Sequence, residues 1–179
     1  MSRIDTFQVA LEFLSEMLAD ETVMLAVWNG QAPVAVCWME AERSVNVHVR
    51  LETSLPVINS ATGRIFAAHL PLGAVKDTLE RELALGVAPT QEGKKMSRAA
   101  FQKLLAQMRQ SGIALVRGDL THGINALSAP VFDHQNAIPF AMTVVGTAGA
   151  FNCELTGPIA RSLRDIAARC SKAIGGPSS

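Results

Sequence analysis

The side chains that most often carry out catalysis or bind metal ions are few in this sequence and stand far apart. Its four histidines and three cysteines form no Cys-x-x-Cys, no His-Glu-x-x-His and no other metal-ligand spacing. Cys37 and His48 could approach each other on neighbouring strands, but a buried, inert thiol is the simpler interpretation of a cysteine in an apolar strand. His134 follows Asp133 in a segment typical of a turn. The sequence therefore predicts no catalytic residue, no metal site and no cofactor.

A different chemistry, the binding of an anion by backbone N–H groups, is indicated around Ser60. The first four N–H groups of a helix have no partner within the helix and lie at the positive end of its dipole. Three such groups would form a site for a carboxylate: those of Ala61, Thr62 and Gly63. Gly63, which lacks a Cβ, would also allow a ligand to come close. The same residues are typical of an ordinary helix capped by Asn59 or Ser60, so both interpretations stay open at this point.

The spacing of apolar residues predicts the helices and strands that must position this site. The predicted helices cover residues 4–18, 60–69, 75–85, 97–110 and 155–174. The predicted strands cover residues 22–28, 34–39, 45–49, 113–117, 124–132 and 138–146. Ser2 and Asp5 are typical of a capped helix start, Asn29-Gly30 predicts a hairpin, and residues 86–95 are the most loop-like stretch.

Strands joined by hairpins and helices segregated from them predict an α+β fold. We expect an antiparallel sheet of about six strands flanked by helices. Residues 1–179 form one domain in this interpretation, with a connecting helix at 1–20 and a loose tail at 175–179.

Composition excludes several classes of protein. Sixteen basic residues balance sixteen acidic ones, so the surplus of positive charge typical of a domain that grips nucleic acid is absent. No apolar run is long enough for a membrane helix, and acidic residues interrupt the first twenty positions where a signal peptide would need an apolar core. Three widely spaced cysteines are typical of a reducing compartment rather than of a disulfide framework. We therefore expect a cytoplasmic protein without a membrane partner.

Two stretches, with these elements in place, resemble the effector-binding domain of the IclR family of transcription regulators. The first runs from Leu55-Pro56 to Gly63-Arg64, where the family has Leu-Pro, a small hydroxyl residue, Ala, any residue, Gly and Lys. The second runs from Gly123 to Gly146, where the family has Gly, Arg-Cys, Ala-Ala-Pro, Asp and a strand that ends in Gly. The two motifs keep the family's order and spacing, and the resemblance extends from about Phe7 to Gly175.

The resemblance implies a GAF-like sensor fold that binds a small metabolite and assembles into a dimer or tetramer. It also implies that the effector binds at the helix terminus beginning at Ser60, opposite side chains of the strands. Carried over position by position, these side chains are Val116, Ala126, Ser128, Thr143 and Val145. In the family a winged helix-turn-helix domain precedes this one and binds operator DNA. Because a single helix precedes the first predicted strand, we expect that domain to be absent from this chain, either because the chain is a fragment or because it is a stand-alone sensor.

The departures from the family pattern remove polar groups from the implied pocket. Val116 replaces a frequent acid, Ala126 a cysteine, and Val145 the second serine of a Ser-x-Ser pair. A pocket for a very small polar acid would need those groups, because an unpaired buried polar atom is costly. The sequence therefore favours a carboxylate effector with a hydrophobic or aromatic body, although valine and alanine on strands are also ordinary core residues. A GAF-like enzyme, such as a thiol reductase, and an oligomerisation module without a ligand remain as alternatives.

Overall fold

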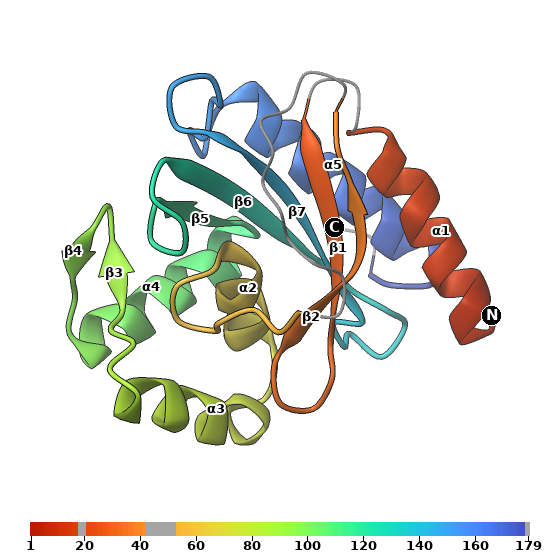
Figure 1. Cartoon of the computed structure of the whole chain (residues 1–179). Coiled ribbons are helices and arrows are strands. Elements are labelled where there is room, and N and C mark those ends of the chain that lie inside the picture. Colours follow the sequence, from red (N-terminus) through yellow and green to blue (C-terminus); the bar gives the residue numbers. More distant parts are fainter. Residues whose placement is uncertain (18–20, 42–52, 178–179) are drawn as a thin grey trace.

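The computed structural model of the chain describes residues 1–17, 21–41 and 53–177 (Figure 1). The helices of this part are α1 (Arg3–Ser15), α2 (Ala61–His69), α3 (Leu72–Ala84), α4 (Arg98–Ser111) and α5 (Pro158–Ala173). The strands are β1 (Thr22–Trp28), β2 (Pro33–Met39), β3 (Thr90–Gln91), β4 (Lys94–Lys95), β5 (Ala114–Arg117), β6 (Ile124–Val131) and β7 (Phe140–Thr147). None of these helices is long and apolar enough to cross a bilayer.

The main sheet has five described strands in the order β2-β1-β7-β6-β5, and every neighbouring pair is antiparallel. Helices α1 and α5 pack against one face and α2 and α4 against the other, as Figure 1 shows. Successive side chains of a strand point to opposite faces. In β7, Met142 accordingly belongs to the core under α1 and α5, whereas Ala141 belongs to the core under α2 and α4. The predicted α+β fold with an antiparallel sheet flanked by helices is confirmed.

Most predicted element boundaries agree with the structure because local residues determine them. Ser2 and Asp5 form a reciprocal capping box at the start of α1. Ser97 caps α4, and Gly112 ends it in the left-handed conformation that glycine adopts without strain. The Asn29 side chain accepts N–H bonds in the predicted β1–β2 hairpin. The predicted strand at 45–49 and His48 lie outside the described residues, so the expected sixth strand is not part of the described sheet.

Two expectations need correction. Residues 86–95 were expected to form a loop, but they contain the β3–β4 hairpin, whose turn places Glu92 at φ 52° and Gly93 at φ 76°. The apolar spacing that predicts the first helix places Ile4 and Leu14 on its buried face; Leu14 is buried, together with Ala10, but Ile4 is 76% exposed. In the expected loose tail, the N–H of Gly176 donates to the carbonyl of Ser171 at 2.7 Å, and residues 178–179 lie outside the described part of the chain.

Candidate functional site

Ser60 and Gly63 determine how the chain enters α2. The Ser60 hydroxyl donates to the carbonyl oxygen of Pro56 at 2.5 Å and accepts the N–H of Gly63 at 2.8 Å. A Cβ on Gly63 would lie 2.2 Å from that same carbonyl oxygen and 2.5 Å from the Cα of Val57. Glycine is therefore required here so that the incoming loop can pack against the helix. The expectation that the Gly63 N–H and its open space serve a ligand is corrected, because Ser60 takes the N–H and the loop fills the space.

The N–H groups of Ala61 and Thr62 remain without a hydrogen-bond acceptor among the described residues. Both residues are buried, with exposed fractions of 1% each. Buried backbone N–H groups are nearly always paired with protein or water, so two adjacent free donors at the positive end of a helix favour an external acceptor. We call these two N–H groups the anion site.

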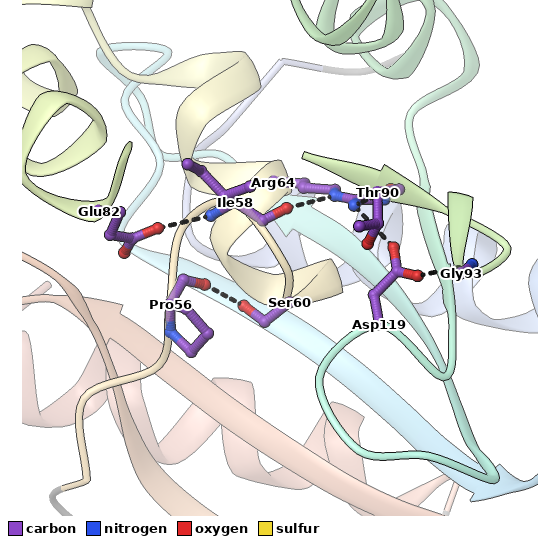
Figure 2. A network of polar contacts seen from close by, with 8 residues as sticks. All are labelled: Pro56, Ile58, Ser60, Arg64, Glu82, Thr90, Gly93 and Asp119. Carbon is purple, nitrogen blue, oxygen red and sulfur yellow. Dashed lines mark hydrogen bonds and ion pairs between the residues drawn. The ribbon is translucent and has the colours of Figure 1, made fainter. Parts of the chain in front are cut away.

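Glu82 of α3 holds the loop that precedes the anion site. Its two carboxylate oxygens accept the N–H groups of Val57 and Ile58 at 2.8 and 2.9 Å, and Figure 2 shows the contact with Ile58. These charge-assisted bonds fix the turn at residues 57–59 from outside the helix. The position of the anion site therefore depends on α3 as well as on Ser60.

Arg64 joins α2 to three other segments through one buried guanidinium (Figure 2). Its Nε donates to the carbonyl of Ile58 at 2.7 Å, and its Nη2 donates to the carbonyl of Thr90 at 2.5 Å and to Oδ2 of Asp119 at 2.9 Å. Both side chains of the ion pair are inaccessible, at 1% and 0% exposure. Burial lowers the pKa of the Arg64 guanidinium, and the Asp119 carboxylate opposes that effect. The charges are compensated internally, so this network is an architectural anchor.

The sheet residues implied by the resemblance lie on one face, as their parity requires. Cross-strand pairing places Val116 beside Ala126 and Ala126 beside Val145, in one row across β5, β6 and β7. Ser128 and Thr143 form the next row. The face is the one covered by α2, which brings the sheet residues opposite the anion site.

A chain of hydroxyl groups connects α2 to this face. The oxygens of Thr62 and Thr143 are 2.7 Å apart, and the Thr143 hydroxyl donates to Ser128 at 2.9 Å. Since Thr143 has a single hydroxyl proton, Thr62 is the donor in the first bond. All three residues are buried. The hydroxyl protons of Thr62 and Thr143 are thus donated in hydrogen bonds within the protein. The backbone N–H groups are therefore the donors that remain for a ligand.

A small cavity of about 60 Å³ lies between the α2 terminus and this face of the sheet. The predicted site residues that line it are Ser60, Ala61, Thr62, Val116, Ala126, Thr143 and Val145. Ser128 does not line it, although it is hydrogen-bonded to Thr143, and Gly63 does not line it either. The structure thus brings together seven of the nine predicted residues around one space.

Six further residues line the cavity that sequence reasoning did not single out: Met24, Trp38, Leu55, Leu120, Thr121 and Ile124. Met24 pairs with Thr143 across β1 and β7, so strand pairing would have identified it. Leu120 and Thr121 belong to the β5–β6 loop, and nothing in their residue types indicates that the loop folds over the site. The apolar majority of this wall agrees with the predicted loss of polarity.

Thr22 contributes an unusual polar group next to the cavity wall. It pairs with Val145, is 3% exposed, and its hydroxyl has no hydrogen-bond partner among the described residues. A buried hydroxyl without a partner costs free energy, and such groups need an explanation in a native protein.

A second cavity, of about 280 Å³, lies against α4 and the edge strand β5. Arg64 and Asp119 line it, whereas the next two residues of the loop, Leu120 and Thr121, line the smaller cavity. The β5–β6 loop therefore separates the two spaces.

The family model described as bacterial transcriptional regulator IclR C-terminal matches residues 1–172. The chain belongs to this family. The IclR-type domain has 34% sequence identity to Pseudomonas aeruginosa HmgR, whose crystal structure superimposes with a TM-score of 0.87 over 98% of this chain and 69% of that one. The crystal structure of the Thermotoga maritima IclR gives a TM-score of 0.79 at 22% identity, over 97% of this chain and 70% of that one.

Curated relatives of the IclR-type domain are named as transcription regulators. The HTH-type transcriptional regulator XynR of Escherichia coli is 24% identical over 176 residues, which are 97% of this chain and 69% of that protein. The HTH-type transcriptional repressor AllR of the same species is 24% identical over 173 residues, which are 96% of this chain and 63% of that protein. The predicted family is confirmed, and the chain spans about two thirds of the length of these relatives.

None of the described histidines and cysteines of the IclR-type domain lines the cavity. His69, at the end of α2, contacts the Phe132 ring edge-on, and burial and then the nearby Arg109 lower its pKa to about 4. Cys170 is fully buried, and burial raises its pKa to about 12. Cys37 and Cys153 do not line the cavity, and no cluster of three potential metal ligands occurs in the part of the chain that the structure describes.

Proposed function

We propose that this domain is the small-molecule sensor of an IclR-type transcription regulator and that it binds a carboxylate with an apolar, preferably aromatic, body. The observation that carries the proposal is the anion site itself. The N–H groups of Ala61 and Thr62 have no acceptor among the described residues, and they border a cavity with mainly apolar walls. A carboxylate supplies the missing acceptors and the negative charge that a helix amino terminus favours.

The rest of the ligand meets a surface with little capacity for hydrogen bonding. The Thr62 and Thr143 hydroxyl groups already donate hydrogen bonds to other side chains of the protein. The remaining wall residues include Met24, Leu55 and Val116. A compact acid with several polar groups would leave some of them unpaired, whereas an apolar body would not.

The size of the cavity determines how such a ligand must enter. At about 60 Å³ it is much smaller than typical ligand pockets, which measure about 300–1,000 Å³. A carboxylate group fits this space, but an aromatic body requires the wall to move outward. Leu120 is the wall residue best placed to move, because it lies in a loop and is 48% exposed.

Two alternative functions are less well supported. A thiol-dependent enzyme would need a cysteine at the cavity, and no described residue lining it is a cysteine. An oligomerisation module without a ligand would not need the cavity that adjoins the start of α2. We therefore propose that the domain has no catalytic activity of its own.

We propose that, in the intact regulator, ligand binding controls the binding of operator DNA by a helix-turn-helix domain linked to α1. The regulator would act as a dimer or tetramer. Helix α1 packs on the face of the sheet opposite α2, next to α5 and β1. Strand β1 touches both sides, because Met24 lines the cavity while Val23 and Leu25 belong to the core under α1. A ligand that shifts β1 would therefore move the connecting helix and change the spacing of paired DNA-binding domains.

A thermal-shift screen of aromatic and aliphatic carboxylic acids, each beside its uncharged amide, tests the proposed ligand class. An acid present at one hundred times its dissociation constant stabilises the domain by about 2.7 kcal/mol, which raises Tm by several degrees. We expect stabilisation by aromatic carboxylates and none by the amides. No shift with any carboxylate would count against the anion site as a ligand site.

A further inference from the structure

The β5–β6 loop, residues 118–123, forms one wall of the candidate effector cavity through Leu120 and Thr121. Glycines flank it at positions 118 and 123, with φ angles of 72° and 78°, which is the left-handed conformation that other residues rarely adopt. Hydrogen bonds from the Gly118 N–H to Ile124 and from the Ile124 N–H to Thr121 close it, both at 3.0 Å. These short-range bonds shape the loop, but they do not attach it to α2.

Asp119 makes that attachment. Its carboxylate is fully buried, accepts Nη2 of Arg64 at 2.9 Å and accepts the N–H of Gly93 at 3.3 Å. Arg64 lies in the first turn of α2, and its Nε holds the carbonyl of Ile58 in the loop before the anion site. One side-chain pair thus connects the cavity wall to the helix that carries the anion site, and Figure 2 shows the pair between Arg64 and Asp119.

The same pair extends to the β3–β4 hairpin. Arg64 also holds the carbonyl of Thr90 at 2.5 Å, so the hairpin and the cavity wall share one anchor. Asp119 directly precedes Leu120, so the wall residue is joined to the hairpin through Asp119 and Arg64. The anchor carries opposite charges in a buried place, where breaking one partner leaves the other uncompensated.

We propose that Asp119, through its ion pair with Arg64, is a positioning residue of the effector site. It fixes the distance between the anion site and the wall formed by Leu120 and Thr121. This inference rests on the proposed function for the identity of the ligand, but the placement of the loop can be measured without any ligand.

The first measurement is amide hydrogen exchange in the ligand-free domain with the substitution Asp119→Asn. We expect the Gly118 and Ile124 amides to exchange at least ten times faster, and the central-sheet amides of Leu127 and Met142 to keep their rates. Asp133→Asn is the matched control, because Asp133 also stabilises a strand-connecting turn but pairs with no buried cation in the described part of the chain. Unchanged exchange at 118 and 124 in Asp119→Asn would overturn the inference.

A second variant covers the case in which Asp119→Asn does not fold because Arg64 is left as an unpaired buried charge. The double substitution Arg64→Met with Asp119→Leu removes both charges and keeps the volume apolar, which buried ion pairs often tolerate. We expect the same acceleration at Gly118 and Ile124 in this variant. Protection equal to that of the wild type would overturn the inference here as well.

A binding measurement separates this inference from the proposed function. Calorimetry with phenylacetate is expected to give at least tenfold weaker binding to Asp119→Asn than to the wild type and to Asp133→Asn. If the wild type binds neither phenylacetate nor the other carboxylates of the screen while exchange accelerates as expected, the proposed ligand class fails and the positioning of the loop stands. If phenylacetate binds equally to Asp119→Asn and the wild type, Asp119 is not a positioning residue of the effector site.

Discussion

Replacing Gly63 with alanine tests how the anion site is built. The new Cβ would lie 2.2 Å from the carbonyl oxygen of Pro56, 2.5 Å from the Cα of Val57 and 2.8 Å from the Ser60 hydroxyl. Two of these atoms belong to the backbone, so the loop must move by about 1 Å to reach ordinary contact distances. That movement also disturbs the hydrogen bonds by which Ser60 caps α2.

The expected cost follows from the overpacking. Forcing extra atoms into a close-packed site costs about 1–3 kcal/mol, and the rigidity of the backbone places Gly63→Ala at about 3 kcal/mol. For a chain of 179 residues, each kcal/mol lowers Tm by about 2–4 °C, so we expect a decrease of about 6–12 °C. Thermal unfolding followed by circular dichroism measures it.

Gly73→Ala is a matched control because Gly73 also lies in the first turn of a helix, α3. A Cβ there would have no heavy atom within 4 Å. Alanine is a better helix former than glycine by up to about 1 kcal/mol, so this variant is expected to be unchanged or slightly more stable. Equal Tm values for the two variants would refute the reasoning that close packing of the loop requires glycine at position 63.

Three further predictions concern the interior. Thr143→Val is expected to destabilise the domain by about 1–3 kcal/mol in urea unfolding, because it leaves buried hydroxyls without a partner; an unchanged midpoint would contradict this. His69 has a folded pKa of about 4, below its unfolded value, so stability is expected to fall by on the order of 2 kcal/mol between about pH 6.5 and 4, less in His69→Phe; identical pH profiles would exclude the role of His69. Cys170 is expected to resist iodoacetamide at pH 8 until the domain unfolds, whereas the partly exposed Cys37 reacts first; mass spectrometry showing the reverse order would disprove the burial argument.

The parts of the fold that sequence predicted are those set by local interactions. Ser2, Ser60 and Ser97 each cap a helix, and each was recognisable from its residue type and the apolar pattern that follows. The β3–β4 hairpin was not recognisable, because Glu92 is an uncommon residue at a positive φ and the strands have only two residues each. Strand pairs so short give almost no periodic signal.

The candidate site was predictable where it follows from strand parity and not where it follows from side-chain pairing. Val116, Ala126 and Val145 share a face because alternate residues of paired strands do. The sequence identifies Ser60 as a candidate cap, but it does not indicate that the loop before α2 packs so closely on Gly63 that only glycine fits there. The burial of Asp119 against Arg64, residues 55 positions apart, likewise requires the folded arrangement.

The central claim is that backbone N–H groups at the start of α2 receive a carboxylate. The most direct measurement is a ¹⁵N–¹H NMR titration of the domain with phenylacetate and other aromatic carboxylates, each beside its amide. With the carboxylates we expect saturable shifts that are largest at the backbone N–H groups of Ala61 and Thr62, and smaller at that of Gly63 because Ser60 accepts it. With the uncharged amide analogues of the same ligands we expect no saturable shifts. Saturable shifts elsewhere that leave Ala61 and Thr62 unperturbed, or equal responses to acid and amide, would contradict the claim.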